Sequence, residues 1–396
     1  MSAPNVSVPK AQSPPPRIDM LGALLVTVGA AALIWLPFVV AKANRIVPGH
    51  ALGLFQVLPA PAGFACVAIL ILAAMSALAS DKPRLRLALA LLGVLAVAMA
   101  VAAASDALTP AGNRIVRIAP GAGFWVLLLS LGLMAADAIT RLQPGPLLRV
   151  ISLALFVGFA LLALASGSFD HLSVMREYAV NATRFAHELR QHLWLALGSL
   201  VAAVIVALPL GVLCHRIPRL RGGILGTLNF VQTIPAIALF GILMAPLGAL
   251  AAAVPLAAAL GIRGIGTAPA IIALFLYSLL PVVANTVLGL GRVSPAAVEA
   301  ARGMGMTRRQ ILSSVELPLA LPVMLTGIRI VLVQNIGLVA VAALIGAGGL
   351  GAFIFQGIGQ TAIDLVLLGA IPTVVLAFSA SVLLDALVES MDRTHA

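Results

Sequence analysis

The sequence predicts an all-α polytopic membrane protein, from its composition, its hydropathy and the way its apolar residues are grouped. Of the 396 residues, 62% are hydrophobic and 9% are charged, and the mean hydropathy is +1.13. A soluble domain is nearer half apolar, with about a quarter of its residues charged. The blocks 20–41, 59–80 and 193–214 each run 22 residues without a charge. A helix of about 20 such residues can cross a bilayer.

About ten transmembrane helices are expected along the chain. They fall at residues 20–41, 59–80, 87–105, 121–140, 150–168, 193–214, 222–245, 267–290, 319–345 and 365–388. The apolar segment 246–262 is short and carries two prolines, so we expect an external hairpin or re-entrant piece there. Residues 1–19 are polar and rich in proline, and we expect them to be disordered. Because the first apolar block is full-length, it is expected to be a retained helix and not a signal peptide.

The basic residues indicate an orientation in the membrane. With both termini in the cytoplasm, the cytoplasmic segments carry 15 Lys and Arg residues and the external segments carry 8. This bias follows the positive-inside rule. The formal net charge of +11 is spread over short loops and is not collected on one face. We therefore expect no nucleic-acid partner.

The polarity of the spans changes near residue 170. Five Ala-, Leu- and Val-rich spans form an N-terminal membrane extension at 20–168, and 169–192 is expected to be an external amphipathic segment. Residues 193–390 form the second part, whose spans carry more polar residues and prolines. Buried polar groups in lipid need partners or water, so function is expected to concentrate there. Candidate pathway residues are Gln232, Thr233, Asn285, Gln334 and Asn335; hydrogen bonding to neighbouring helices is the alternative role for each.

A polar run between two spans, 293–318, has the signals of two short helices. Its sequence is VSPAAVEAARGMGMTRRQILSSVELP. Ser294 and Pro295 are typical of an N-cap followed by the first helical position. Gly303 and Gly305 would allow a sharp turn, and Thr307 with Gln310 predicts a capping box at the start of a second helix. Leu317 and Pro318 are expected to end that helix. The run therefore predicts a rigid helix–turn–helix on the cytoplasmic face.

Several other patterns do not support a catalytic site. His187 and His192 are five residues apart, whereas a zinc-protease helix needs histidines four apart on one face. The pattern Gly346-x-Gly348-x-x-Gly351 lacks the strand that precedes a dinucleotide-binding loop, and we expect a tight external turn. No Walker A motif occurs. We therefore expect no catalytic residue, no metal and no cofactor in this chain.

Three charged residues, Asp137, Arg329 and Asp385, fall within or at the ends of predicted spans. Charge inside a membrane suggests function by default, such as proton coupling. Their positions near the cytoplasmic side favour structural pairing or snorkelling to the interface instead.

The run 293–318 resembles the EAA loop of ABC-importer permeases. Glu299, Ala300 and Ala301 match its start, Gly305 has the family spacing, and Glu316, Leu317 and Pro318 match its end. Val315 replaces the usual isoleucine. The resemblance covers about 193–390, and FVQTIPAIALFGIL and AALIGAGGLG within it resemble osmoprotectant permeases. The length and the extra N-terminal spans most resemble the Yeh-type branch of that group.

This resemblance implies a type I ABC-importer permease core and a set of partners. The loop would be the coupling helix, with Glu299, Ala300, Ala301, Arg302, Gly305 and Pro318 contacting a cytoplasmic ABC ATPase that uses the ATP. A periplasmic or extracellular binding protein would deliver an osmoprotectant such as glycine betaine or choline. A homodimer in the lipid of the bacterial inner membrane is expected. A permease for another small solute, such as an amino acid, and an autonomous secondary transporter remain the alternatives.

Overall fold

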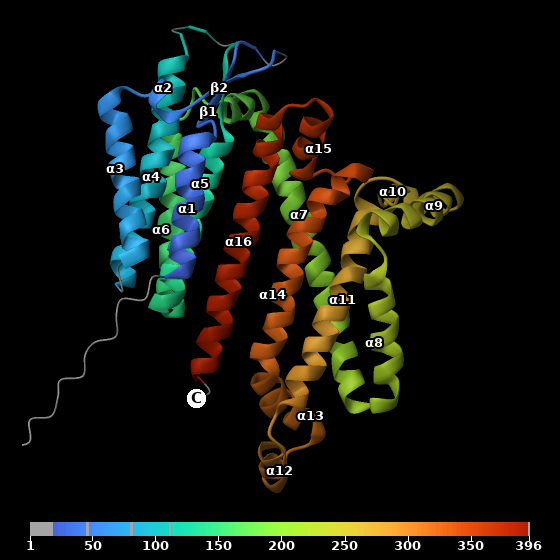
Figure 1. The fold of residues 1–396 in the computed structure, drawn as a ribbon. Coiled ribbons are helices and arrows are strands. Elements are labelled where there is room, and N and C mark those ends of the chain that lie inside the picture. The colour runs from blue at the N-terminus through green and yellow to red at the C-terminus, as the bar shows by residue number, and fades with distance from the viewer. Residues whose placement is uncertain (1–18, 45–46, 80–81, 111, 114, 395–396) are drawn as a thin grey trace, which may run out of the picture. The chain divides into compact units, whose positions relative to one another are not determined.

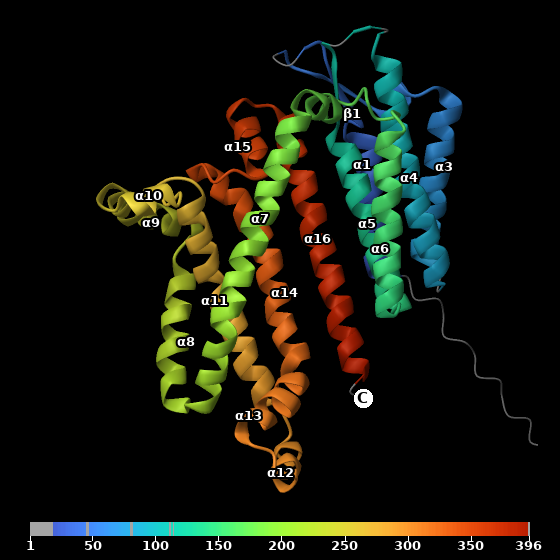
Figure 2. The same cartoon turned by 180° about the vertical axis from the view of Figure 1, so that it is seen from behind.

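The computed structural model describes residues 19–394, apart from 45–46, 80–81, 111 and 114. The expected disorder of residues 1–18 lies outside the described part of the chain. The chain divides into two compact units (Figures 1 and 2). The first unit comprises 1–144 with 167–172, and the second comprises 145–166 with 173–396.

The first unit is a helical bundle with a small sheet at one end. Its helices are α1 (Met20–Trp35), α2 (Leu54–Val57), α3 (Ala60–Ala79), α4 (Pro83–Leu108) and α5 (Ala122–Leu142), and its strands are β1 (Val39–Lys42), β2 (His50–Leu52) and β3 (Arg117–Pro120). The antiparallel sheet has the order β2-β1-β3, with Val39 opposite Leu52 and Pro120.

This sheet corrects the predicted span 20–41. Helix α1 ends at Trp35, and residues 39–42 form β1. Pro37 explains the early stop, because proline cannot continue a helix and biases the residue before it toward extended backbone. The 16 residues of α1 make it shorter than the other apolar helices of the bundle. Periodicity does not reveal such short strands when their residues continue an apolar block.

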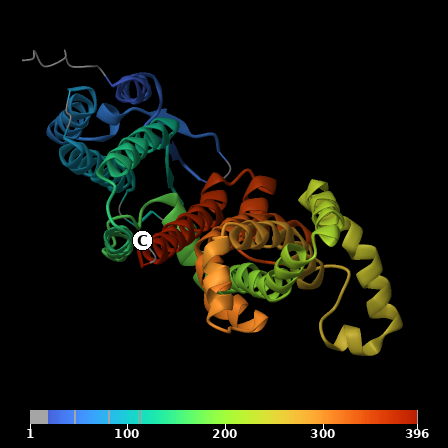
Figure 3. The same cartoon turned by 90° about the horizontal axis from the view of Figure 1, so that it is seen from below.

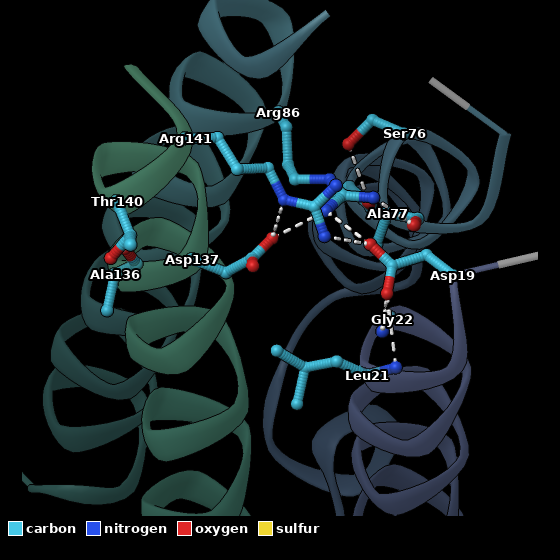
Figure 4. Close-up of polar contacts among 11 residues, drawn as sticks. Asp19, Leu21, Gly22, Ser76, Ala77, Arg86, Ala136, Asp137, Thr140 and Arg141 are labelled. Carbon is cyan, nitrogen blue, oxygen red and sulfur yellow. Dashed lines mark hydrogen bonds and ion pairs between the residues drawn. The ribbon is translucent and has the colours of Figure 1, made fainter. Parts of the chain in front are cut away.

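Four charged side chains form a compact ion cluster at the end of this bundle where α1 and α4 begin (Figure 4). Arg86 is buried and bonds to Asp19 at 2.8 Å and to Asp137 at 2.6 Å. Arg141 pairs with Asp137 at 2.9 Å and also with Asp19. Asp19 additionally caps α1 by accepting from the backbone N–H groups of Leu21 and Gly22. The structural pairing expected for Asp137 is confirmed.

The cluster makes Asp19 more acidic. Burial acts to raise the pKa of Asp19, but hydrogen bonds from Arg86 and Gly22 and the charges of Arg141 and Arg86 together lower this pKa below its usual 3.8. The charged form is therefore favoured in the folded state.

The second unit contains the remaining helices. They are α6 (Pro146–Ala165), α7 (Ser173–Arg216), α8 (Pro218–Thr233), α9 (Ala236–Ala253), α10 (Pro255–Ala259), α11 (Thr267–Gly291), α12 (Pro295–Gly303), α13 (Arg308–Ile311), α14 (Leu317–Ala342), α15 (Gly351–Gly359) and α16 (Ile363–Thr394). A π-helical turn, Leu312–Glu316, joins α13 to α14, and a 3₁₀ turn, Ala343–Ile345, follows α14.

Helices α7, α11 and α14 form the core of this unit (Figure 1). Leu195, Leu274 and Val339, one from each helix, are completely buried in the same apolar cluster. Helix α16 packs on α14, and α6 packs on α16 through contacts that include an Arg149–Glu389 ion pair of 3.0 Å. By its contacts, α6 thus belongs with the second unit, although the sequence groups it with the N-terminal extension.

The predicted span 222–245 is wrong, because the helix breaks at Ile234 and Pro235. Proline removes a backbone donor and clashes with the preceding turn. After the break, α9 lies across the end of α8 and α11, and α10 follows it (Figures 1 and 3). Of the segment 246–262, expected as a hairpin or re-entrant piece, residues 246–253 continue α9 and α10 follows after Val254. Helix α9 is apolar and long enough to cross a membrane, so the re-entrant piece stays a prediction. Its placement outside the cell remains a prediction.

Helix α7 also differs from the predicted boundary. The segment 169–192 and the span 193–214 were expected as separate elements, but Ser173–Arg216 is one helix of 44 residues. Its N-terminal part turns away from the direction of the rest, which runs along α11 and α14 (Figure 2). An amphipathic stretch followed directly by an apolar one contains no helix-breaking residue at the junction, so the helix continues.

The described helices fit a polytopic membrane protein. Nine are long and apolar enough to cross a membrane, and α1 is a shorter apolar helix. The set includes α9 and omits α8, so it is not identical to the ten spans expected. Helix α6 exposes large apolar side chains, such as Leu155 at 69% and Leu162 at 72%. Such a surface suits contact with lipid.

We predict that Arg86→Met destabilises the protein by about 3–5 kcal/mol, because it leaves two carboxylates with one remaining guanidinium. Thermal unfolding of the purified protein in detergent measures the effect. Arg84→Met is the control, since Arg84 is exposed two residues earlier on the same helix. Equal melting of the two variants would contradict the prediction.

The same cluster predicts a pH dependence. Because the folded-state pKa of Asp19 is lowered from 3.8, its contribution to stability is present above that pH and is lost as the pH falls through the folded value. Asp19→Asn should therefore melt at a lower temperature than the parent protein at neutral pH, and the difference should shrink in acid.

Candidate functional site

Loop 293–318 has the helix–turn–helix shape that its sequence predicts. Helix α12 begins at Pro295, and α13 begins after Thr307. The capping box is confirmed: the Gln310 N–H donates to Thr307 Oγ1 at 3.4 Å, and the Thr307 N–H donates to Gln310 Oε1 at 2.8 Å. Gly305 has a φ of 81°, so the turn between the helices requires a glycine there. Ser294 takes the N-cap position without a side-chain hydrogen bond.

Two details of this loop differ from the sequence prediction. Gly303 is the last residue of α12 and has no positive φ, so Gly305 alone supplies the left-handed turn. The second helix does not end at Leu317 and Pro318. It continues through the π-helical turn into α14, because Pro318 stands in the first turn of α14, where a missing N–H costs little.

The residues expected to contact an ATPase are not all on the loop surface. Glu299, Ala300 and Arg302 are exposed, and so is Gly305, whereas Ala301 is 1% exposed. Pro318 is half-buried at the base of the loop. Exposure therefore favours Glu299, Ala300 and Arg302 as docking residues. Ala301 instead packs inside, where its carbonyl also accepts the Met306 N–H at 3.1 Å.

An ion pair fastens the base of the loop to α7. Glu316 is buried and accepts a hydrogen bond from Arg216, the last residue of α7. The sequence marks Glu316 as part of a motif and Arg216 as a topological charge, but it does not indicate that the two meet. They are 100 positions apart, and no local signal identifies such a partner.

The five candidate pathway residues do not gather into one site. Asn335 is completely buried and donates to Ser199 and Ser278, both at 3.0 Å, so it joins the three core helices. Thr233 donates to the Phe230 carbonyl and Asn285 to the Pro281 carbonyl, each within its own helix. Gln334 is half-buried on α14. None of the described hydrogen bonds joins two of the five, and their pathway role remains a prediction.

Gln232 lies where α8 breaks. Its Nε2 donates to the Tyr277 carbonyl on α11 at 2.7 Å, and the Tyr277 hydroxyl donates back to the carbonyl of Ile234. A break in a membrane helix frees backbone groups that must find other partners. The Tyr277 hydroxyl supplies such a partner for the Ile234 carbonyl. Gln232 in return bonds the Tyr277 carbonyl, which lacks its usual helical donor because the residue four positions on is Pro281.

A stripe of polar residues on α7 binds the turn 346–351, named here the glycine turn. Glu188 accepts the Gly349 N–H at 2.7 Å, and Gln191 donates to the Ala347 carbonyl at 3.3 Å. His192 lies between the Ile336 carbonyl, 3.0 Å from Nε2, and the Leu350 N–H, 3.3 Å from Nδ1. A carbonyl only accepts and an N–H only donates, so the imidazole is neutral with its proton on Nε2. The histidine pattern that resembles a zinc helix is thus part of a backbone clamp.

Two further intramembrane charges are paired. Arg329 of α14 forms an ion pair with Asp385 of α16. The expected structural pairing is confirmed for both residues, and neither is left as an isolated carboxylate or guanidinium for proton transfer.

The fold and this loop define a polytopic membrane transport protein. Residues 197–393 match the family model for the binding-protein-dependent transport system inner membrane component. Residues 19–175 match the model described as ABC transporter permease YehY, N-terminal domain.

Curated relatives each match about half of the chain. The osmoprotectant import permease protein OsmW of Salmonella typhimurium is 45% identical over 50% of this chain and 86% of its own. The carnitine transport permease protein OpuCD of Listeria monocytogenes is 40% identical over 52% and 86%. The choline transport system permease protein OpuBD of Bacillus subtilis is 37% identical over 53% and 87%.

The chain therefore belongs to the family of binding-protein-dependent inner membrane components. It is the multi-pass membrane permease of an ABC importer, a transport subunit and not an enzyme. This membership argues against an autonomous secondary transporter.

We predict that Gly349→Ala destabilises the second unit by about 1–2 kcal/mol, the cost of a left-handed backbone for a residue with a side chain. Gly349 has a φ of 84°, and an added Cβ would lie 3.2 Å from His192 Nδ1. Gly337→Ala on α14 is the control, because nothing lies within 4 Å of its added Cβ. Thermal unfolding in detergent compares the variants, and equal melting temperatures would show that the clamp tolerates the change.

Proposed function

We propose that this permease imports an osmoprotectant such as glycine betaine or choline, delivered by a binding protein, with the work supplied by a separate ATPase that docks on loop 293–318. One observation carries the coupling part: the exposed two-helix loop is joined rigidly to two core helices. It continues into α14 through the π-helical turn, and the Glu316–Arg216 pair links it to α7.

This connection supplies a route for force. A displacement of α12 and α13 is transmitted along the backbone to α14 and through the Glu316–Arg216 ion pair to α7. Glu316 is buried and Arg216 is exposed, so loss of Arg216 would leave a buried carboxylate without its partner. Asn335 and its partners Ser199 and Ser278 then join these two helices to α11. Motion of the loop is thereby coupled to the whole core.

The docking residues proposed are Glu299, Ala300 and Arg302, with Gly305 setting the turn. Figure 1 supports the orientation, since the C-terminal end of α7, the start of α8 and helices α12 and α13 lie at one end of the second unit. Arg216, Arg219, Arg221, Arg302, Arg308 and Arg309 belong to these elements. The positive-inside rule assigns that end to the cytoplasm. Both termini of the chain are proposed to be cytoplasmic.

The energy source and the assembly follow from the same proposal. The chain itself carries no Walker A motif, so we assign ATP binding to the ATPase subunits and no cofactor to the permease. A single permease supplies half of a pathway, and we propose a homodimer embedded in lipid with two ATPase subunits.

The substrate class is supported by the names of the relatives, which refer to osmoprotectants, carnitine and choline. Quaternary ammonium groups are commonly held by aromatic cages, and this chain is 5% aromatic. We therefore place strong substrate selection in the binding protein. Another small solute, such as an amino acid, is the remaining alternative.

We predict that Glu299→Gln weakens ATPase docking about 30-fold or more, since loss of one charged partner at an interface costs about 2 kcal/mol or more. Gly305→Ala should also impair docking by straining the turn. Gly303→Ala is the matched control, because its added Cβ meets nothing within 4 Å and its φ is not positive. Co-purification of the ATPase and uptake by cells measure the effect. Retention of both in Glu299→Gln and Gly305→Ala would exclude this docking site.

For the substrate, we predict ATP-dependent uptake of labelled glycine betaine or choline by vesicles containing the complete importer with its binding protein. An excess of unlabelled carnitine should compete, and an excess of a neutral amino acid should not. Competition by the amino acid alone would reassign the substrate while leaving the coupling proposal intact.

A further inference from the structure

A hollow of about 550 Å³ opens at the end of the first unit where α4 begins and α5 ends. Its lining consists of Lys82, Pro83, Arg84, Leu85, Arg141 and Leu142. Three of these six residues are cationic, and none is acidic. None of its lining residues belongs to loop 293–318 or to the residues assigned above to transport.

Arg141, one of the cationic residues that line the hollow, is held in place by Asp137. Figure 4 shows Arg141 beside the Asp19–Arg86–Asp137 group, and Asp137 bonds Arg141 Nε at 2.9 Å. The two guanidiniums of the ion cluster are balanced by its two carboxylates. Lys82 and Arg84 are two further cationic side chains in the lining of the hollow. Asp81, which precedes Lys82 in the sequence, lies outside the described residues.

The position of the hollow near a bilayer surface means that its ligand should also have an apolar part. Helices α4 and α5 are long and apolar enough to cross a membrane, so their ends lie near a bilayer surface. Leu85, in the wall, is 46% exposed, and Leu142 is half-buried beside it. Basic pockets at helix ends on the cytoplasmic side bind anionic lipid headgroups. A ligand that suits this hollow has a phosphate to meet the cations and an acyl chain to lie along the leucines.

We propose that this hollow binds the phosphate headgroup of an anionic phospholipid. Arg84 and Lys82 contact the phosphate, and Arg141, oriented by Asp137, forms the inner wall. Leu85 and Leu142 contact the first carbons of the acyl chains. The ion cluster that stabilises the bundle thus also positions one wall of a lipid site.

The chain contains its own matched control. The tetrapeptide Pro-Arg-Leu-Arg begins α4 at Pro83 and begins α8 at Pro218. Arg84 and Arg219 therefore occupy the same position in the first turn of a helix, and both are exposed. Only Arg84 lines the hollow described here. Binding that depends on local sequence or general basicity would treat the two arginines alike.

The test is titration of the purified full-length protein in neutral detergent with short-chain phosphatidylglycerol, followed by native mass spectrometry. Phosphatidylethanolamine is the zwitterionic comparison. We expect preferential binding of phosphatidylglycerol, weakened about fivefold by Arg84→Gln or by Lys82→Gln and about 25-fold by both together. Arg84→Lys should retain most of the affinity, and Arg219→Gln should leave it unchanged.

Three outcomes would overturn the proposal. Equal binding of the two lipids, or equal loss in Arg84→Gln and Arg219→Gln, would show that no specific headgroup site exists here. Displacement of phosphatidylglycerol by the same concentration of inorganic phosphate would assign the site to a free anion. Melting curves of the variants in detergent without added lipid separate loss of folding from loss of binding.

Discussion

The bilayer leaves a backbone amide or carbonyl no water to bond with, and the irregular parts of the second unit show how the chain meets that constraint. At the break between α8 and α9, the Tyr277 hydroxyl bonds the Ile234 carbonyl, and Gln232 bonds the Tyr277 carbonyl four residues before Pro281. At the glycine turn, Glu188, Gln191 and His192 occupy backbone groups that no helix satisfies. Each irregularity is paired with side chains from a neighbouring core helix.

The two units handle polarity differently. At the centre of the second unit, neutral groups join the three core helices, with the amide of Asn335 between two serine hydroxyls. The ion pairs of this unit, such as Glu316–Arg216, are partly exposed. The first unit concentrates full charges at one end, where Arg86 is buried between Asp19 and Asp137. Desolvation of a neutral polar group costs less than desolvation of a full charge, and breaking a buried charge network by removing one partner is strongly destabilising.

Local signals in the sequence predict local structure, but they do not predict contacts between residues far apart in the chain. The capping box at Thr307 and Gln310 lies within four residues and is confirmed in detail. The Glu316–Arg216 pair joins positions too far apart for any pattern to relate. The strand at 39–42 is hidden because its apolar residues extend a helix-like block, and only Pro37 marks the change. The charged stretch before residue 193 predicts an amphipathic surface helix. In the structure, its polar residues Glu188, Gln191 and His192 bind the glycine turn.

The π-helical turn at Leu312–Glu316 has a consequence for how the loop can evolve. Such a turn contains one residue more than the regular helix would need. Removing a residue from it would restore an uninterrupted α-helix but would rotate everything before it by about 100° relative to α14. Glu316, which directly precedes α14, would keep its place, but α12 and α13 would be reoriented and the face carrying Glu299 would point elsewhere. The number of residues in this segment therefore sets the rotation of α12 and α13 about the axis of α14. Single-residue insertions or deletions between α13 and α14 should be far less tolerable than substitutions at the same positions.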